Sequence, residues 1–386
     1  MNLKVISRNV GFALLASAFF MFLSILVSNS NGNDSALAAL IISFTITFIV
    51  GIFPFIFVRK SPNISLKDGY MIIVLSWTLS FIFGMLPYVL WGGPFSVINA
   101  LFEAVSGYTT TGGTVLANVE QLPDSLLFWR SSTHFIGGLG VVVFMLLINP
   151  SSSPVRLRLT NMEVSSLSRE GYKTRTNKTV WVFTAVYFGI AICAFLCYWL
   201  AGMSPFDAIN HAFSVTATGG FSTRNMSIAS FDSTLIDVIT IFFMFIASIH
   251  FGIIYMVFAS RSLKPLNNPV LKFYVGTILA AALLVAFSLK MSSAGFTWGE
   301  SFMTGIFQVV SSISTTGFAI SDNNTWPLFA CIITVLITVP CGMAGSTTGG
   351  IKMDRMLLMF KSVGQQVKSS MHPSSINHVH NVNHML

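Results

Sequence analysis

The feature that most constrains this chain is a series of long apolar runs with almost no charge. A helix needs about 20 consecutive apolar residues to cross the hydrocarbon core of a membrane. Seven runs meet this length: 9–28, 37–58, 70–91, 125–149, 180–201, 235–260 and 269–289. An eighth begins at Trp326, is interrupted near 341–350 and resumes around 351–360. The sequence therefore predicts an all-α polytopic membrane protein.

Composition supports this class and excludes an ordinary soluble domain. Only 9% of the residues are charged, whereas soluble domains carry about 25%. The first apolar run follows Lys4 and Arg8, so a signal peptide is the alternative interpretation. We favour an anchor, because the run is longer than the apolar region of a signal peptide and a second run follows closely.

The basic residues indicate how the chain is oriented. If the first crossing starts in the cytoplasm, cytoplasmic segments hold every Lys and Arg except Arg130, Arg224 and Lys290. Positive charge gathers in cytoplasmic loops, so both termini are expected to be cytoplasmic. The net charge of +8 then needs no nucleic-acid partner.

Three polar stretches interrupt the apolar pattern at corresponding places. They read SGYTTTGGT at 106–114, VTATGGFST at 215–223 and SISTTGFA at 312–319, and each follows a short amphipathic stretch. Their glycines, Gly112, Gly219 and Gly317, are 107 and 98 residues apart. This long period indicates duplicated units of outer helix, half-helix, polar loop and inner helix. The expected divisions are 1–68 (two N-terminal helices), 69–176, 177–266 and 267–366 (three units), and 367–386 (a polar tail).

Such loops are suited to a cation. Non-helical backbone at membrane depth is tolerated only where protein buries it or where it lines a water-filled cavity. Rings of backbone carbonyls replace the hydration shell of an alkali cation, and the C-terminal end of each half-helix adds negative potential. We expect Glu103, Asp207 and Glu300 to add further negative potential at the mouth. Surface turns are the alternative for any one loop, but three in matching positions favour a filter.

The interruption of the eighth run, CGMAGSTTGG, is too rich in glycine and hydroxyl residues for a stable helix in lipid. A polar plug inside a cavity fits this composition. A phosphate-binding P-loop does not, because Ile351 stands where that motif requires lysine.

The chain resembles the TrkH/KtrB family of bacterial potassium uptake proteins, whose fold consists of potassium-channel-like repeats. The resemblance covers nearly the whole chain, and the two extra N-terminal helices favour the TrkH branch. It is strongest in TTTGGT, LFWRSSTHFIGGLGVVV (127–143), TATGGFST, SSISTTGF and CGMAGSTTGGIKMDR (341–355).

The resemblance implies the site residues and the substrate. Potassium would be the substrate, with no cofactor, and the only bound metal would be potassium at the filter. The implied filter residues are Thr110, Thr111, Gly112, Ala217, Thr218, Gly219, Thr315, Thr316 and Gly317. The implied gating loop comprises Gly342, Gly345, Ser346, Thr347, Thr348, Gly349 and Gly350.

The resemblance also implies partners and a location. The partners would be a cytosolic nucleotide-binding regulatory subunit of the TrkA type and a second copy of the chain, in the bacterial inner membrane. The basic segment 156–178 is either a docking face for the regulator or orientation charge alone. The tail contains several histidines, so a metal site is conceivable there, but we favour a polar tail without one.

We find three filter units in this chain, whereas members of the family carry four. The main hypothesis is potassium uptake through a carbonyl-lined filter gated by the 342–350 loop, impaired to the extent that a fourth unit is required. The alternative is a non-conducting membrane scaffold or regulatory subunit. An enzyme is not expected, because no nucleophile–base pair or metal-spaced cluster appears within the apolar runs.

Overall fold

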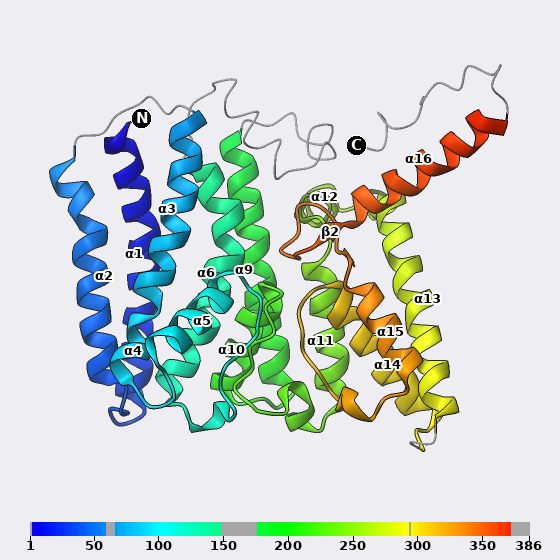
Figure 1. Cartoon of the computed structure of the whole chain (residues 1–386), viewed down its shortest axis with the longest axis horizontal. Coiled ribbons are helices and arrows are strands. Elements are labelled where there is room, and N and C mark those ends of the chain that lie inside the picture. The colour runs from blue at the N-terminus through cyan, green and yellow to red at the C-terminus, as the bar shows by residue number, and fades with distance from the viewer. Residues whose placement is uncertain (1, 59–65, 148–175, 293–294, 372–386) are drawn as a thin grey trace.

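The fold is almost entirely helical (Figure 1). The computed structural model describes residues 2–58, 66–147, 176–292 and 295–371. Two segments discussed above lie outside these ranges. They are residues 156–175 of the basic segment 156–178, and the tail from 372 to 386 with its histidines. The N-terminal end of α1 and the helix α16 lie at the upper side of the view, and the turn between α1 and α2 lies at the lower side.

Long apolar helices form the frame. The N-terminal pair is α1 (Leu3–Ser30) and α2 (Leu37–Phe57), followed by α3 (Leu66–Gly84) and the short α4 (Leu86–Trp91). Further along the chain come α6 (Asp124–Leu147), α9 (Thr176–Leu200) and α13 (Pro269–Met291). Five segments in the described ranges are long and apolar enough to cross a membrane: Leu3–Ser30, Leu37–Phe57, Lys67–Trp91, Trp181–Leu200 and Pro269–Met291. The predicted all-α polytopic membrane fold is therefore confirmed.

Large apolar side chains remain exposed along the outer surfaces of these helices. Examples are Ile49 and Phe53 on α2, and Leu283 and Phe287 on α13, each more than half exposed. In water such a surface would be a large exposed apolar patch, but in a bilayer it faces hydrocarbon chains.

Three short helices enter the bundle as half-helices. These are α5 (Val97–Tyr108), α10 (Pro205–Thr216) and α14 (Trp298–Ile313). Each begins at a hydroxyl side chain that accepts a hydrogen bond from the backbone of the first turn, which favours helix initiation there. The capping residues are Ser96, Ser204 and Thr297. Each half-helix ends in one of the three polar loops, and an apolar helix follows that loop.

The helix after the second loop differs from the sequence prediction. We predicted one span over 235–260, but the structure has α11 (Thr234–Ala247) and α12 (Phe251–Ser260), bent by 98° at the break between them. The break was not predicted, because Ser248, Ile249 and His250 include neither glycine nor proline.

The predicted interruption of the last span is present. The helix α15 (Leu328–Ile337) ends before a two-residue strand β1 (Pro340–Cys341), which pairs in parallel with β2 (Ile351–Lys352). The strand pair closes the 342–350 loop, and α16 (Met353–Met371) then leads away from the bundle (Figure 1). The 3₁₀ turns are η1 (Val119–Gln121), η2 (Ser227–Phe231), η3 (Lys264–Leu266) and η4 (Asn323–Thr325).

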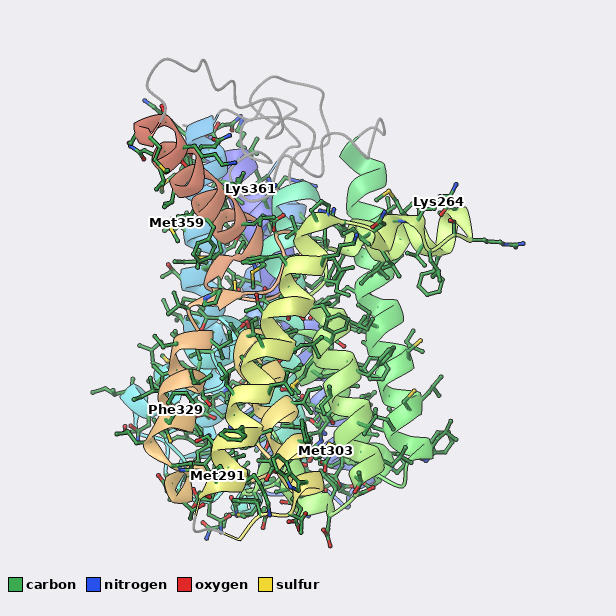
Figure 2. The ribbon with its side chains drawn as sticks, turned by 90° about the vertical axis from the view of Figure 1, so that its right-hand side faces the viewer. Lys264, Met291, Met303, Phe329, Met359 and Lys361 are labelled. Atoms are coloured by element: carbon green, nitrogen blue, oxygen red, sulfur yellow. The ribbon has the colours of Figure 1, made fainter. Side chains whose placement is uncertain are left out.

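The half-helices are held by two apolar clusters. One lies among α1, α4, α5 and α6 and includes Tyr88, Tyr108 and Trp129. The other extends over the helices from α9 through α14 and includes Tyr274 and Phe307. In the side view, Lys264 and Lys361 lie near the upper end, and Met291 and Met303 lie near the lower end (Figure 2). The loops are thus fixed inside a helical frame whose outer surface is apolar.

Candidate functional site

The three polar loops share one backbone conformation. Thr110, Thr218 and Thr315 have φ of 53°, 53° and 55°, in the left-handed region. That conformation costs about 1–2 kcal/mol for a residue with a side chain. Two positions later, Gly112, Gly220 and Gly317 have φ of 75°, 82° and 84°. Strain repeated at corresponding positions of three loops is typical of a functional site rather than of ordinary turns.

This geometry corrects the predicted register of the second loop. In the first loop the amide of Thr111 donates to the Ser106 carbonyl, and the matching bond in the second loop runs from Gly219 to Ser214, each at 2.9 Å. Gly220, not Gly219, is therefore the counterpart of Gly112 and Gly317. The sequence alignment was wrong by one residue because the second loop contains two consecutive glycines, and only the dihedral angles distinguish them.

The correction places each predicted filter residue. Thr110 and Thr111, Thr218 and Gly219, and Thr315 and Thr316 occupy matching positions of the three loops. Ala217 lies one step earlier than predicted: it is the buried C-cap of α10. Gly220, absent from the predicted set, completes the second loop.

Neighbouring loops touch through their backbones. A Cβ atom added to Gly112 would lie 2.0 Å from the Gly219 carbonyl oxygen, and one added to Gly220 would lie 2.0 Å from the Thr316 carbonyl oxygen. No side chain fits at either position. At Gly317 no described atom lies within 4 Å of the corresponding point. The loops therefore follow one another in chain order, first against second and second against third.

Side chains of the half-helices make hydrogen bonds to the residues that follow each glycine. The Ser106 hydroxyl donates to the Gly113 carbonyl at 2.6 Å, and the Ser311 hydroxyl donates to the Phe318 carbonyl at 2.7 Å. In the second unit the Nε2 atom of His211 lies 2.9 Å from the Ser222 hydroxyl. Each loop is thus supported from behind by its own half-helix.

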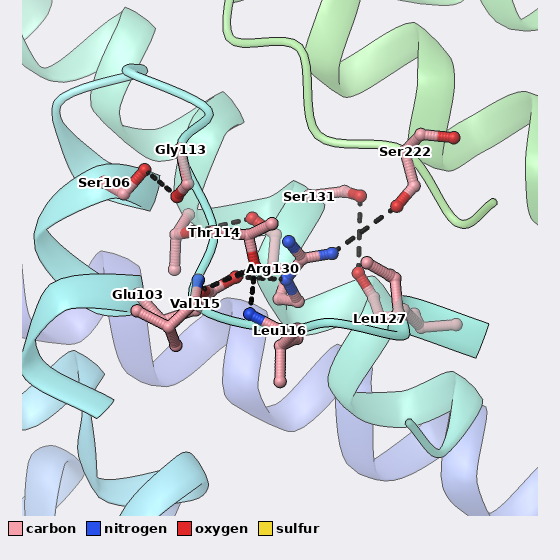
Figure 3. A network of polar contacts seen from close by, with 12 residues as sticks. Glu103, Ser106, Gly113, Thr114, Val115, Leu116, Leu127, Arg130, Ser131 and Ser222 are labelled. Carbon is pink, nitrogen blue, oxygen red and sulfur yellow. Dashed lines mark hydrogen bonds and ion pairs between the residues drawn. The ribbon is translucent and has the colours of Figure 1, made fainter. Parts of the chain in front are cut away.

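The first loop is held by a buried ion pair (Figure 3). The Nε atom of Arg130 on α6 donates to Oε1 of Glu103 on α5 at 2.7 Å, and both side chains are almost completely buried. The Thr114 hydroxyl lies 3.0 Å from both carboxylate oxygens of Glu103. The position of Arg130 near the end of a span would allow its side chain to extend toward the membrane surface. In the structure its guanidinium is instead enclosed in protein.

A second ion pair stands at the second loop. Nη2 of Arg224 donates to Oδ2 of Asp207 at 2.8 Å, and the Thr223 hydroxyl donates to Oδ1 at 2.6 Å. Burial raises the pKa of Asp207, but the hydrogen bonds from Thr223, Arg224 and Ser204 outweigh it and leave the pKa below its ordinary value. Asp207 and Glu103 are each neutralised by an arginine, so neither supplies the net negative potential predicted at the mouth. Glu300 is exposed and caps α14 through Thr297.

The predicted gating loop lies against two of the three filter loops. The Thr347 hydroxyl donates to the carbonyls of Thr216, at the end of α10, and Ala247, at the end of α11. The Gly349 amide donates to the Thr315 hydroxyl at 2.9 Å.

The same loop fills the break between α11 and α12. The Met343 amide donates to the Ser248 carbonyl at 2.9 Å, and the Phe251 amide donates to the Gly345 carbonyl at 3.1 Å. Within the loop, Ser346 and Thr348 share a hydrogen bond at 2.8 Å, and Lys352 bonds Thr348. Gly342 would place a Cβ 2.7 Å from Ser248, and Gly350 begins the return to β2. The α11–α12 break is therefore part of the site. It was not predicted from the sequence, because its residues include neither glycine nor proline.

Histidine and carboxylate side chains do not form a metal centre in the described ranges, where no group of three or more His, Cys, Asp or Glu is placed to hold an ion. His134 stacks on Phe221 at 4.0 Å between ring centroids and lies 3.2 Å from the Ser214 hydroxyl. Such contacts are those of packing residues.

Comparison with known proteins decides the family. A family model described as "TrkH: Cation transport protein" matches residues 37–384. The chain belongs to the TrkH family. This is a family of cation transport proteins and not one of enzymes.

Individual TrkH-family relatives agree along almost the full chain. The Trk system potassium uptake proteins TrkH of Vibrio parahaemolyticus and Escherichia coli are each 31% identical over 97% of this chain, which covers 79% and 78% of their lengths. The Trk system potassium uptake protein TrkG of Escherichia coli is 30% identical over 97% of the chain and 78% of its own length.

A solved TrkH-family structure has the same fold. The crystal structure of the potassium transporter TrkH from Vibrio parahaemolyticus matches with a TM-score of 0.86 and 30% identity, over 98% of this chain and 79% of that one. The three loops and the 342–350 loop therefore belong to a membrane protein of the TrkH fold.

Proposed function

We propose that this chain is a potassium uptake protein of the bacterial inner membrane. The observation that carries the proposal is the repeated loop conformation. Three loops with matching left-handed threonines and glycines lie in direct backbone contact within an apolar helical frame. The named activity of the TrkH-family relatives, potassium uptake, fits such a site.

The proposed filter works through carbonyl oxygens. Backbone carbonyls replace the water shell of an alkali cation without placing a full negative charge in the membrane. The C-terminal ends of α5, α10 and α14 add partial negative charge behind the loops. Since Glu103 and Asp207 are each paired with an arginine, selectivity rests on oxygen position rather than on net charge.

Transport through this path would be passive. The membrane potential supplies about 2.3 kcal/mol per elementary charge for each 100 mV, and an inside-negative potential draws cations inward.

The 342–350 loop is the proposed gate. It bonds to Thr216 and Thr315 at the ends of the second and third half-helices, and to both sides of the α11–α12 break. A loop held by single hydrogen bonds to several helices is displaced at a modest cost, because each such bond contributes about 1 kcal/mol net. Movement of α11 and α12 relative to each other would release it.

The proposed partners follow from the relatives. Their name describes components of a Trk system, and we propose a cytosolic nucleotide-binding regulatory subunit and a second copy of this chain as partners. Co-purification of the tagged chain with a TrkA-type subunit, and its mass in detergent, test these two points.

Growth and uptake test the transport function. A bacterial host without its own potassium uptake systems, grown at limiting potassium, should grow when this chain is expressed with its regulator. Gly220→Ala should abolish growth, because its Cβ would meet the Thr316 carbonyl. Gly276→Ala on α13 is the matched control, since no atom lies within 4 Å of that Cβ position. A chain that binds the regulator but never restores growth or Rb⁺ uptake would be the scaffold instead.

A further inference from the structure

The Glu103–Arg130 pair reaches two loops rather than one. On the side of the first loop, Glu103 accepts hydrogen bonds from the Thr114 hydroxyl and from the Val115 amide, at 3.0 and 3.3 Å. Thr114 is two residues beyond Gly112. The carboxylate therefore fixes the chain where it leaves the first proposed filter loop.

On the side of the second loop, Arg130 makes two contacts. Its Nη1 atom donates to the Ser222 carbonyl at 3.4 Å, and its guanidinium carbon lies 4.0 Å from the centroid of the Phe221 ring. Phe221 follows Gly220 directly and is buried. The ring also stacks on His134, one helical turn beyond Arg130 on α6. A guanidinium is suited to this arrangement, because its planar fork donates to several acceptors while its face lies on an aromatic ring.

The other two units lack an equivalent charged pair. The positions that match Glu103, nine residues before the loop glycine, are His211 and Gln308. His211 contacts Ser222 of its own loop. In the third unit Ala319 stands at the position of Thr114, and the Oε1 atom of Gln308 has no hydrogen-bond partner among the described residues. Among the residues that the structure describes, a charged pair therefore links different loops only in the first unit.

We propose that Glu103 and Arg130 are positioning residues for cation selection, a role that rests on the proposed filter. As one neutral buried unit they hold the segment after Gly112 and the segment after Gly220 at a fixed separation. Neither side chain contacts the ion. They set the distance between the carbonyls of the first and second loops, and hence which cation fits between them.

Competition between cations tests this role. The purified chain is reconstituted into liposomes that contain potassium. Uptake of Rb⁺ is measured with and without competing Na⁺ for wild type, Glu103→Gln and Arg130→Lys. Glutamine keeps the shape of Glu103 without its charge, and lysine keeps the charge of Arg130 without the fork. Arg8→Lys is the matched control, because Arg8 on α1 also donates to a backbone carbonyl, that of Val58, and lies over an aromatic ring, that of Phe55, but is not part of the three loops.

Both test variants should lower the preference for Rb⁺ over Na⁺ by about tenfold or more, because small displacements of positioned groups have effects of this size. The control should keep the wild-type preference. If Arg130→Lys does not accumulate in the membrane, Phe221→Leu removes the ring contact and should shift the preference in the same direction. An unchanged preference in folded variants that still transport Rb⁺ overturns the proposal. Absence of Rb⁺ uptake both by the wild type reconstituted with its regulator and by the Thr347→Val variant, or full uptake by Gly220→Ala, contradicts the proposed filter itself.

Discussion

The Nε atom of Arg130 lies 2.7 Å from Oε1 of Glu103, and both side chains are enclosed in protein. An ion pair in this setting stabilises the fold only while both charges are present. Removing one partner of a buried pair leaves an uncompensated charge, at a cost of about 3–5 kcal/mol.

We therefore expect Arg130→Met to lower the thermal stability of the purified protein strongly. The double variant Glu103→Gln/Arg130→Met should recover part of the loss, because glutamine carries no charge but still accepts a hydrogen bond from Thr114. Thermal unfolding in detergent measures both variants. A double variant less stable than Arg130→Met would show that the unpaired charge is not the cause.

The corrected register of the second loop predicts different effects for two adjacent glycines. Gly220 has φ of 82° and its added Cβ would meet a backbone carbonyl, whereas the Cβ of Gly219→Ala would meet the His134 side chain. A side chain adjusts more easily than the backbone of a neighbouring loop. Gly220→Ala should abolish Rb⁺ uptake, and Gly219→Ala should retain a measurable part of it. The reverse order would restore the register suggested by the sequence.

The bonds of Thr347 predict a gate that is easier to open when they are removed. Thr347→Val loses hydrogen bonds to the carbonyls of Thr216 and Ala247. A loss of one or two kcal/mol changes an equilibrium by about 5–30-fold, so Rb⁺ influx without the regulator should rise by about fivefold or more. Thr334→Val is the control, because among the described residues that hydroxyl bonds only the Ala330 carbonyl, within α15. Equal influx in both variants would mean that Thr347 does not hold a gate.

The Asp207–Arg224 pair predicts a dependence of stability on pH. The pKa of Asp207 lies below its ordinary value, which is about 3.9. The stabilisation from its carboxylate is therefore complete above that value and is lost as the pH falls through the lowered pKa. Wild type should exceed Asp207→Asn in unfolding temperature at neutral pH, and the difference should shrink as the pH falls through the lowered pKa of Asp207. An equal difference in unfolding temperature at neutral and at low pH would show that the charge of Asp207 does not cause the stabilisation.

Much of the fold is predictable from the sequence because lipid imposes simple rules. The apolar runs that became α1, α2, α9 and α13 are long enough to cross a membrane, and their boundaries agree with the prediction to within four residues, except that α1 begins at Leu3 and not at residue 9. The interruption of the last span was also predictable, because glycine and hydroxyl residues cannot continue a helix there.

The details of the site were less accessible for physical reasons. The break at 248–250 is stabilised by bonds from the 342–350 loop, nearly a hundred residues away, rather than by its own residues. In the sequence, Glu103 was predicted to be a charge at the mouth and Arg130 was one of three basic residues outside the cytoplasmic segments, and only the fold brings them together. The register at Gly219 and Gly220 depends on backbone dihedral angles, which cannot be determined from two consecutive glycines in the sequence.

The central claim is that a cation is held by the backbone oxygens of the three loops, and the most direct measurement is to locate that cation. Crystals of the protein grown with Tl⁺ or Rb⁺ would show the ion by its anomalous scattering. The account predicts anomalous density beside the carbonyls of the loops at Thr110, Thr218 and Thr315, and loss of that density in Gly220→Ala. Density only at carboxylates such as Asp207 or Glu300, with none at the loops, would contradict it.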